Sequence, residues 1–176
     1  ANATALMLGD GTQIGRLLNE GAIEATTNTT EGDSAIAVDI ASGADVTSIT
    51  NLGEISAQTV GESGNATAII DRSGQLTDIT NNGTISATLT STAQTVMTPG
   101  AIRAIDLSAH GASDNVTYLQ QRETATEDVN NDGTIDENDA RTPQLSGDVL
   151  FGAGDETFSV LAGAVDGNID FGTGNV

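Results

Sequence analysis

Apolar and polar residues alternate along much of this 176-residue chain, in short stretches separated by turns rich in Gly, Asn, Asp and Ser. Alternation with a period of two is the pattern of a β-strand with one buried face. The clearest cases are the stretches 3–8, 35–40, 66–71 and 101–107. The sequence therefore predicts an all-β protein built from short strands.

The strands also recur at fixed distances. The segments 17–23, 49–55 and 79–85 read LLNEGAI, ITNLGEI and ITNNGTI, and their glycines are 32 and then 30 residues apart. Like residues at a constant offset predict a parallel β-solenoid, in which each repeat is one coil of three strands. We expect Ile49 to stack on Ile79, and Ile55 on Ile85. At ~4.8 Å between paired strands, about six coils would form a rod ~30 Å long.

Two further repeats support this interpretation. Asn19, Asn51 and Asn81 hold equivalent places, so their amides are expected to stack as a ladder that satisfies backbone groups inside a bend. Near the C-terminus, GDVLFGAG at 147–154 returns as GNIDFGTG at 167–174, with every position shifted by 20. The three Phe residues are expected to fill or cap these last coils.

The amino-acid composition excludes several classes of function. The chain has 25 acidic residues against 5 arginines and a formal net charge of −20, which excludes a nucleic-acid partner and disfavours an anionic membrane surface. It has no Cys, hence no disulfide or thiolate metal site, and no apolar run long enough to span a membrane. Few aromatics and high acidity are also typical of disordered chains, but the repeats favour a folded one.

The C-terminal repeat, together with the upstream ITNNGTISA-type units, resembles the passenger region of bacterial type V autotransporters. The resemblance implies a right-handed parallel β-helix, with residues 1–176 forming a single solenoid fragment. It implies a location outside the cell, on the bacterial surface, through a C-terminal outer-membrane barrel that is missing from this sequence. It also implies a structural stalk or adhesion scaffold rather than an enzyme, with a host-cell or matrix ligand or a neighbouring surface protein as partner.

One charged insertion, residues 122–144, interrupts the repeats. Within it, six residues and Gly133 match positions 1, 3, 5, 6, 7, 9 and 12 of a calcium loop, and the six candidate ligands are Asp128, Asn130, Asp132, Thr134, Asp136 and Asp139. Ca²⁺ takes six to eight oxygen ligands, and Thr134 would offer its carbonyl. The loop resembles EF-hand and dockerin loops. It departs from the EF-hand in having Asp139 at position 12 instead of Glu, and in Pro143, which disfavours a long exiting helix.

An alternative without an ion stays open at this stage. The stretch 129–135 also fits the ITNNGTI turn, so the segment could be an ordinary coil. Aligning 116–121 with 46–51, and 144–146 with 84–86, favours an insertion that protrudes from a turn. The sequence therefore predicts a calcium site here, with an ordinary coil as the alternative.

Two other functions compete with the stalk. A polysaccharide-active enzyme on the same fold would need paired carboxylates, and the candidate pairs are Asp71 with Asp78 and Asp166 with Asp170. With so few aromatic rings to stack a sugar, we expect solvated acidic turns instead. Gly32-Asp33-Ser34 with the single His110 is likewise expected to be a turn, not a serine nucleophile with its base. The other competitor is a surface-layer module assembled through calcium.

Overall fold

The computed structural model describes residues 2–28, 32–61, 63–90 and 100–174. In these residues the protein is all-β, with strands and turns and no helix. Every strand pair among them is parallel. The predicted fold class is therefore confirmed at the level of an all-β protein with parallel sheets.

The strands form three main sheets. The first has the order β1-β5-β9-β12-β15-β18, with bounds Ala3–Leu8, Ser34–Ile40, Asn65–Asp71, Ile102–Asp106, Asp148–Leu150 and Ile169–Asp170. The second has the order β3-β7-β10-β13-β16, with bounds Leu17–Asn19, Ser48–Asn51, Asp78–Asn81, Thr117–Gln120 and Thr157–Val160. The third has the order β4-β8-β11-β14-β17, with bounds Ala22–Asn28, Glu54–Val60, Thr84–Thr90, Gln144–Ser146 and Ala164–Asp166. A short pair joins β2 (Gln13–Ile14) to β6 (Asp45–Val46).

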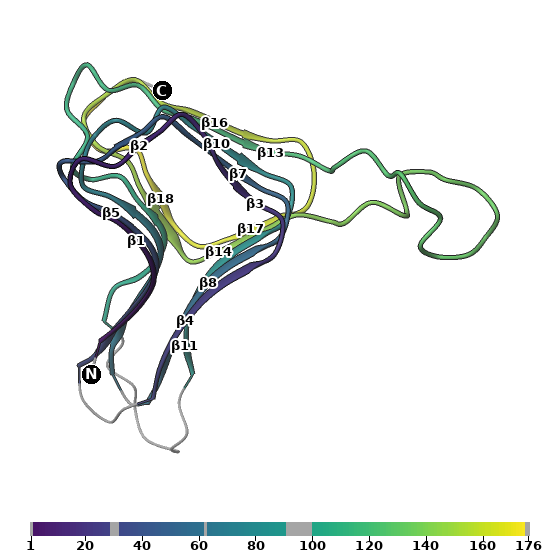
Figure 1. Ribbon diagram of the computed structural model, residues 1–176, viewed down its shortest axis with the longest axis horizontal. Helices are drawn as coiled ribbons and strands as arrows, with labels where there is room; N and C mark the ends of the chain where they lie inside the picture. The colour runs from purple at the N-terminus through teal and green to yellow at the C-terminus, as the bar shows by residue number, and fades with distance from the viewer. Residues whose placement is uncertain (1, 29–31, 62, 91–99, 175–176) are drawn as a thin grey trace.

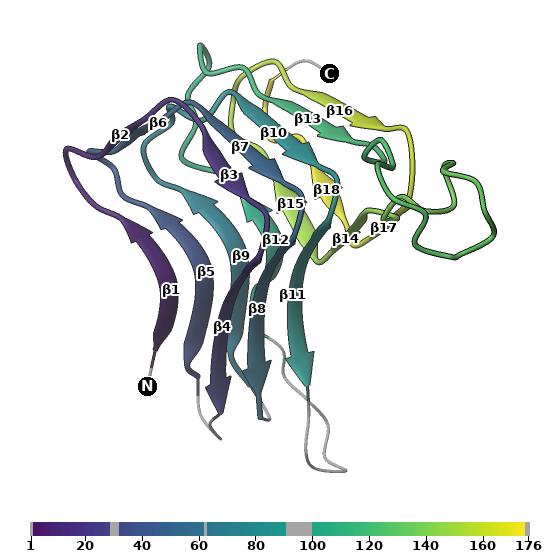
Figure 2. The same ribbon diagram turned by 45° about the vertical axis from the view of Figure 1, so that its right-hand side comes forward.

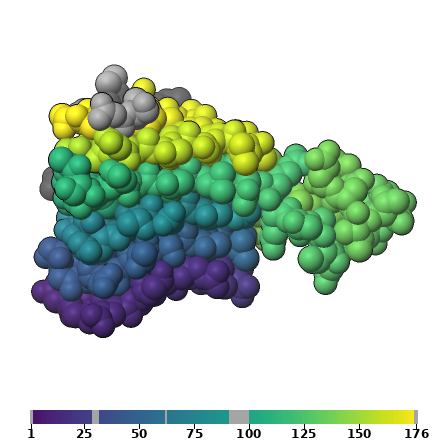
Figure 3. Space-filling view, turned by 90° about the horizontal axis from the view of Figure 1, so that it is seen from above, coloured from purple at the N-terminus to yellow at the C-terminus, as the bar shows by residue number. Residues whose placement is uncertain are grey.

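The chain visits the three sheets in turn, and each pass lays one strand beside its equivalent from the pass before. We call one such pass a circuit. Figure 1 looks through the resulting triangular body, and Figure 3 shows the circuits as successive layers from the N-terminal to the C-terminal end. This arrangement is compatible with the predicted solenoid.

The registers follow the sequence repeats. Ile49 pairs with Ile79, and Ile55 pairs with Ile85, so both predicted stacks are confirmed. All four side chains are buried. The C-terminal offset of 20 is confirmed as well, because Val149 pairs with Ile169. Since β-branched side chains suit a pleated surface, repeated Ile and Val at one position build a continuous aliphatic row through the body.

Below the triangular body, the first and third sheets continue as two facing layers (Figures 1 and 2). Strands β5 and β9 contact β4, β8 and β11 there. The buried residues on these facing strands include seven alanines, namely Ala25, Ala35, Ala37, Ala57, Ala66, Ala68 and Ala87. Small side chains let the two layers approach closely, whereas Ile and Leu fill the wider triangle.

The asparagine ladder is present. Asn19 Nδ2 donates to Asn51 Oδ1 at 2.8 Å, and Asn51 Nδ2 donates to Asn81 Oδ1 at 3.0 Å. The same nitrogens donate to the carbonyls of Glu54 and Thr84, both at 2.9 Å. These bonds satisfy carbonyl groups at the bend between the second and third sheets.

Glycine recurs beside each ladder residue because the circuits approach too closely for a side chain. A Cβ on Gly53 would overlap the carbonyl oxygen of Gly21, and one on Gly83 would overlap that of Gly53. The glycines at 21, 53 and 83 that reveal the repeat in the sequence are thus the places where backbone packs on backbone.

The alignment of 116–121 with 46–51 is wrong by one residue. Thr117 shares the register position of Asp78 and Ser48, not that of Thr47, so Gln120 joins the ladder in place of Gln121. Asn81 Nδ2 donates to Gln120 Oε1 at 3.2 Å. A one-residue shift exchanges the two faces of a strand, and this register buries the Tyr118 ring instead of Leu119.

The aromatic residues close the C-terminal part of the body, as expected for the phenylalanines. Tyr118 stacks on Phe158 with ring centroids 4.6 Å apart, and Phe151 stacks on Phe171 at 5.4 Å. Phe151 and Phe158 meet edge to face at 6.3 Å. The Tyr118 hydroxyl donates to Gln120 Oε1 at 2.8 Å, which ties the aromatic stack to the ladder.

Because Asn51 lies in the middle of the ladder, we expect Asn51→Ala to destabilise the folded chain strongly. This change removes a buried amide and leaves the Thr84 carbonyl and the neighbouring amides short of partners, so we expect the free energy of unfolding to fall by about 1–3 kcal/mol. Equilibrium urea unfolding measures it. The exposed Asn28→Ala is the control, with an expected change within about 0.5 kcal/mol. Equal effects from the two variants would contradict a structural role for the ladder.

Candidate functional site

The predicted calcium loop lies between β13 and β14 and projects from one corner of the body (Figures 1 and 3). The strands on either side keep the register of the preceding circuit, because Gln120 pairs with Asn81 and Gln144 pairs with Thr84. Residues 121–143 contain no strand. The segment is therefore an insertion, and the alternative of an ordinary coil at 129–135 is wrong.

Both arms of the loop are fastened. Arg141 Nη1 donates to the Leu52 carbonyl at 2.7 Å, reaching back to an earlier circuit. Arg122 Nη1 donates to the Glu137 carbonyl at 3.0 Å, which joins one arm to the other. Pro143 is buried at the base, where its carbonyl accepts from Ala164 N–H at 3.3 Å. The loop therefore has a fixed attachment and an exposed tip.

The tip is held by bonds from its own backbone to its acidic side chains. Asp128 accepts from Asp132 N–H at 3.2 Å and from Gly133 N–H at 2.9 Å. Asp139 accepts from Val129 N–H at 2.8 Å and from Asn130 N–H at 2.9 Å. The first and last predicted ligands thus reach across the loop and close it.

The backbone takes up two left-handed residues within this closed loop. Asn131 has φ of 60° and Gly133 has φ of 93°. Asn and Gly are the residues that adopt this region most readily. Asp132 sits between them, and its Oδ1 accepts from Thr134 N–H at 2.9 Å and Thr134 Oγ1 at 2.7 Å. The predicted spacing therefore coincides with a tight, locally specified bend.

Hydrogen bonding keeps two of these carboxyls ionised. The Thr134 hydroxyl and N–H lower the pKa of Asp132, and the N–H groups of Asn130 and Asp136 lower the pKa of Asp139. The like charge on Asp132 acts on Asp139 in the opposite direction. Both are exposed or half-buried, so the tip presents concentrated negative charge to solvent.

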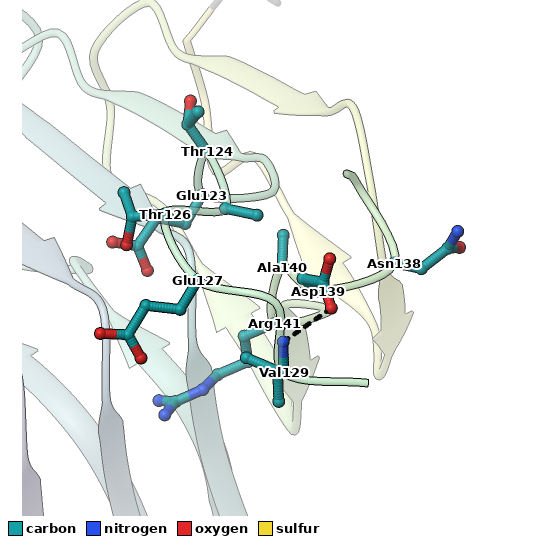
Figure 4. Close-up of a pocket in the computed structure, with 10 residues that line it drawn as sticks. Glu123, Thr124, Thr126, Glu127, Val129, Asn138, Asp139, Ala140 and Arg141 are labelled. Carbon is teal, nitrogen blue, oxygen red and sulfur yellow. Dashed lines mark hydrogen bonds between the residues drawn. The ribbon is translucent and has the colours of Figure 1, made fainter. Parts of the chain in front are cut away.

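The six candidate ligands lie in one loop, but their side chains do not converge on a common centre. In the described part of the chain, no group of three or more His, Asp or Glu side chains has an arrangement that could hold a metal ion. The donors nevertheless fit calcium in kind, since carboxylate, amide and carbonyl oxygens are its ligands. A hollow of about 450 Å³ lies between the arms, lined by Glu123, Glu127, Val129, Asp139 and Arg141 among others (Figure 4).

A second cluster lies inside the body. His110 Nε2 is 2.8 Å from Asp71 Oδ2, and both side chains are fully buried. Asp71 also accepts from Ser73 N–H at 2.8 Å and from Leu76 N–H at 3.1 Å. Burial raises the pKa of Asp71, but the hydrogen bonds from His110, Ser73 and Leu76 outweigh it, and the net pKa is lowered.

This cluster corrects one expectation about the candidate carboxylate pairs. Asp71 is buried and paired with His110, so it does not lie in a solvated turn. The other pair, Asp166 and Asp170, lies exposed on strands of different sheets. Neither the Asp71–His110 contact nor the burial of Glu156 was predicted. The sequence offered one indication of a buried His110: this single His closely follows the alternating apolar stretch 101–107.

Comparisons with known proteins identify no relative. No protein-family model matches the chain, and searches of curated proteins and of solved structures find no significant match. The resemblance to autotransporter passengers therefore rests on the repeats alone. In the residues that the structure describes, no helix is long and apolar enough to cross a membrane.

Because the buried Asp71 carboxyl is stabilised in its ionised form, we expect the folded chain to lose stability in acid. Its pKa in the folded chain lies below the ordinary value of 3.8, so its contribution to stability is complete above that value and is lost as pH falls through the folded value. We expect the free energy of unfolding to fall below about pH 5, with a slope of up to ~1.4 kcal/mol per pH unit from this carboxyl. Urea unfolding between pH 6 and 3 measures the slope.

The variant Asp71→Asn should flatten this slope, and the exposed Asp78→Asn should leave it unchanged. Part of the slope will persist, because Ser108 and Arg103 lower the pKa of Asp106 against the effect of its burial. An acid slope in Asp71→Asn equal to that of the parent chain would show that Asp71 does not contribute.

Proposed function

We propose that this chain is a segment of a right-handed parallel β-helix of about six coils that acts as a structural stalk or adhesion scaffold on a bacterial surface. The observation that carries the proposal is the in-register stacking of like residues from circuit to circuit, with Asn on Asn, Ile on Ile and Gly on Gly. A chain stacked in this way forms a rod along one axis, because the strands of each circuit pair only with those of the neighbouring circuits.

The charge distribution supports a scaffold that stays separate from its copies. The formal net charge is −20, and the acidic side chains lie mainly in turns, on outward faces and in the loop. Strong like charge opposes association between identical surfaces. Among the buried carboxylates, Asp39 is paired with Arg72 at 3.0 Å. We infer an exported protein, held at the outer membrane by an autotransporter-type barrel.

The protruding loop is proposed as the calcium-binding part of this scaffold. Five carboxylates between 128 and 139 repel one another at close range, and a divalent cation would relieve this. Asp128, Asn130, Asp132, Asp136 and Asp139 would supply side-chain oxygens, and Thr134 its carbonyl. Extracellular calcium modules typically bind with a Kd of ~10⁻⁴ to 10⁻³ M, which suits a surface protein.

The same loop is the proposed place for a partner. Val129 is 67% exposed and Ile135 is 57% exposed, and both belong to the protruding loop. Apolar residues presented this way are suited to contact another surface. A host-cell or matrix ligand, or a neighbouring surface protein, would meet the loop first, with its conformation set by calcium.

Calcium should protect the loop from proteolysis. We expect trypsin cleavage after Arg122 and Arg141 to slow by about tenfold or more when Ca²⁺ is raised from zero to 5 mM, because bound loops open less often. Mass spectrometry of timed digests measures both sites. Asp132→Asn should abolish the protection, and the matched variant Asp45→Asn, on β6, should retain it.

Deleting the loop tests whether the body folds without it and whether calcium binding resides in it. Replacing 122–142 with two glycines should leave the unfolding transition of the body within about 1 kcal/mol of the parent chain and eliminate calcium binding. Cleavage that is insensitive to millimolar Ca²⁺ would remove the calcium proposal. A deletion variant that does not fold would contradict an independent scaffold.

A further inference from the structure

The asparagine ladder has a direction, because each side-chain amide donates to the circuit that follows it along the chain. The amides succeed one another in the order Asn19, Asn51, Asn81 and Gln120. Their nitrogens also donate to bend carbonyls of the following circuits, those of Glu54, Thr84, Gln144 and, for Gln120, both Ala162 and Ala164. The ladder is therefore polar along the axis of the body, and its acceptors face the N-terminal end.

At the C-terminal end of the body the ladder is complete. Gln120 pairs with Val160, so Val160 holds the ladder position in the last circuit. The Val160 side chain has no hydrogen-bonding atom. The carbonyls of Ala162 and Ala164 beside it already accept from Gln120, at 3.0 and 3.1 Å. Val160 therefore presents no amide to a further circuit at this end.

At the N-terminal end the ladder is open. Among the described residues, Asn19 Oδ1 accepts from Gly21 N–H of its own turn, at 3.3 Å, and from no other group. Asn81 Oδ1, by contrast, accepts both from its own turn and from the amide of the preceding circuit. The Ala22 carbonyl corresponds to that of Glu54, yet no side-chain amide of the described residues donates to it. Two acceptors thus wait for one amide.

The backbone beside Asn19 is open in the same direction. In the second circuit, Leu52 N–H donates to the Asn19 carbonyl at 2.8 Å, and Glu54 N–H donates to the Gly21 carbonyl at 2.7 Å. The corresponding N–H groups of the first circuit belong to Glu20 and Ala22, and no earlier circuit lies beside them in the described residues. Strands β1, β3 and β4 are the edges of their sheets there (Figures 2 and 3). Such edges pair readily with an added strand.

Gly21 is a further sign of what this end accepts. Gly53 and Gly83 must be glycine because a Cβ there would overlap a carbonyl oxygen of the preceding circuit. A Cβ on Gly21 would meet nothing within 4 Å. Gly21 therefore leaves space at the N-terminal end for one more carbonyl, at the place where each later glycine receives one.

The aliphatic stack is open at this end as well. The inward residues of the first circuit are Leu6, Leu17 and Ile23, and they share positions with Val38, Ile49 and Ile55 of the second. The second-circuit residues are at most 1% exposed, whereas those of the first circuit are only partly buried. An apolar surface thus adjoins the open amide and carbonyl groups.

We propose that the N-terminal end of the body binds an extended segment of a separate polypeptide, which lies parallel to β3 and β4 and adds a strand to the second and third sheets. The segment carries Asn or Gln opposite Asn19, and aliphatic residues opposite Leu17 and Ile23, two positions before and four positions after that amide. Its amide donates to Asn19 Oδ1 and to the Ala22 carbonyl. Strand addition at a sheet edge is a common mode of peptide recognition, with backbone bonds giving affinity and alternate side chains specificity.

A second copy of this chain does not fit the same end. Its C-terminal end would bring Val160, which has no amide, over Asn19. The first sheet has one strand more than the other two, so β18 would meet β1 before β16 met β3. Two N-terminal ends would place acceptors opposite acceptors. The polarity of the ladder therefore favours a different polypeptide.

Binding of a synthetic peptide to the 176-residue chain tests the proposal. The peptide has the sequence of residues 46–60, VTSITNLGEISAQTV, which contains the required spacing. In NMR spectra of the 15N-labelled chain, we expect the peptide to shift the amide signals of Leu18, Glu20 and Ala22 and to leave that of Leu161 unchanged. The Ala22 amide should exchange at least about tenfold more slowly, because the peptide gives it an acceptor.

Two peptide variants separate the ladder from unspecific strand pairing. Asn51→Val, which copies the residue at 160, should weaken binding by about tenfold or more, because the Asn19 and Ala22 oxygens are then covered without a donor. Thr50→Ser, on the outward face, should bind within about twofold of the parent peptide.

Three results would overturn the proposal. The first is an absence of shifts at about 1 mM peptide, and the second is equal binding of the Asn51→Val and Thr50→Ser peptides. The third is end-to-end association of the chain alone, seen in sedimentation at the NMR concentration, since it would make a second copy the occupant. We expect the chain alone to sediment as a monomer.

Discussion

The structure depends on one constraint: equivalent residues must lie directly over one another on parallel strands about 4.8 Å apart. At that spacing an Asn amide can donate to the amide above and to a backbone carbonyl at once, as Asn51 does. The same spacing leaves no space for a Cβ at Gly53 and Gly83. The distance between paired strands therefore selects the Asn and Gly residues whose recurrence reveals the repeat in the sequence.

This constraint explains an acidic chain with little aromatic content. Each circuit is thin, and rows of Ile, Val, Leu and Ala fill it without large rings. Acidic side chains then belong in turns, on outward faces and in the loop at 122–143, where water solvates them. Where carboxylates enter the body they have specific partners, as Asp106 has in Ser108 and Arg103. Glu156 is the exception, because both of its carboxyl oxygens are buried without a hydrogen-bond partner in the described residues.

Much of the fold is predictable from the sequence because stacking is periodic. The Ile49–Ile79 and Ile55–Ile85 stacks, the asparagine ladder and the 20-residue C-terminal offset all follow from spacing. The register at 116–121 does not, since Gln120 and Gln121 are adjacent and only the burial of the Tyr118 ring decides between them. The Asp71–His110 pair was also not predictable, because it joins corners of successive circuits whose turns differ in length.

The loop shows how far local sequence alone predicts a candidate site. Its spacing identifies the acidic donors, and the observed bend places left-handed residues at Asn131 and Gly133, beside Asp132. Its carboxylates accept from backbone N–H groups of the same loop. Local sequence therefore specifies the turn, and the proposed ion would set the arrangement of the oxygens around it.

The most direct measurement of in-register stacking is hydrogen exchange of the side-chain amides. If Asn51 and Asn81 are stacked in a buried ladder, their NH₂ protons should exchange at least about a hundredfold more slowly than those of the exposed Asn28 and Asn138, because exchange requires opening of the circuits. NMR of the 15N-labelled chain resolves these groups. Exchange of the Asn51 and Asn81 amides as fast as that of Asn28 would contradict the account.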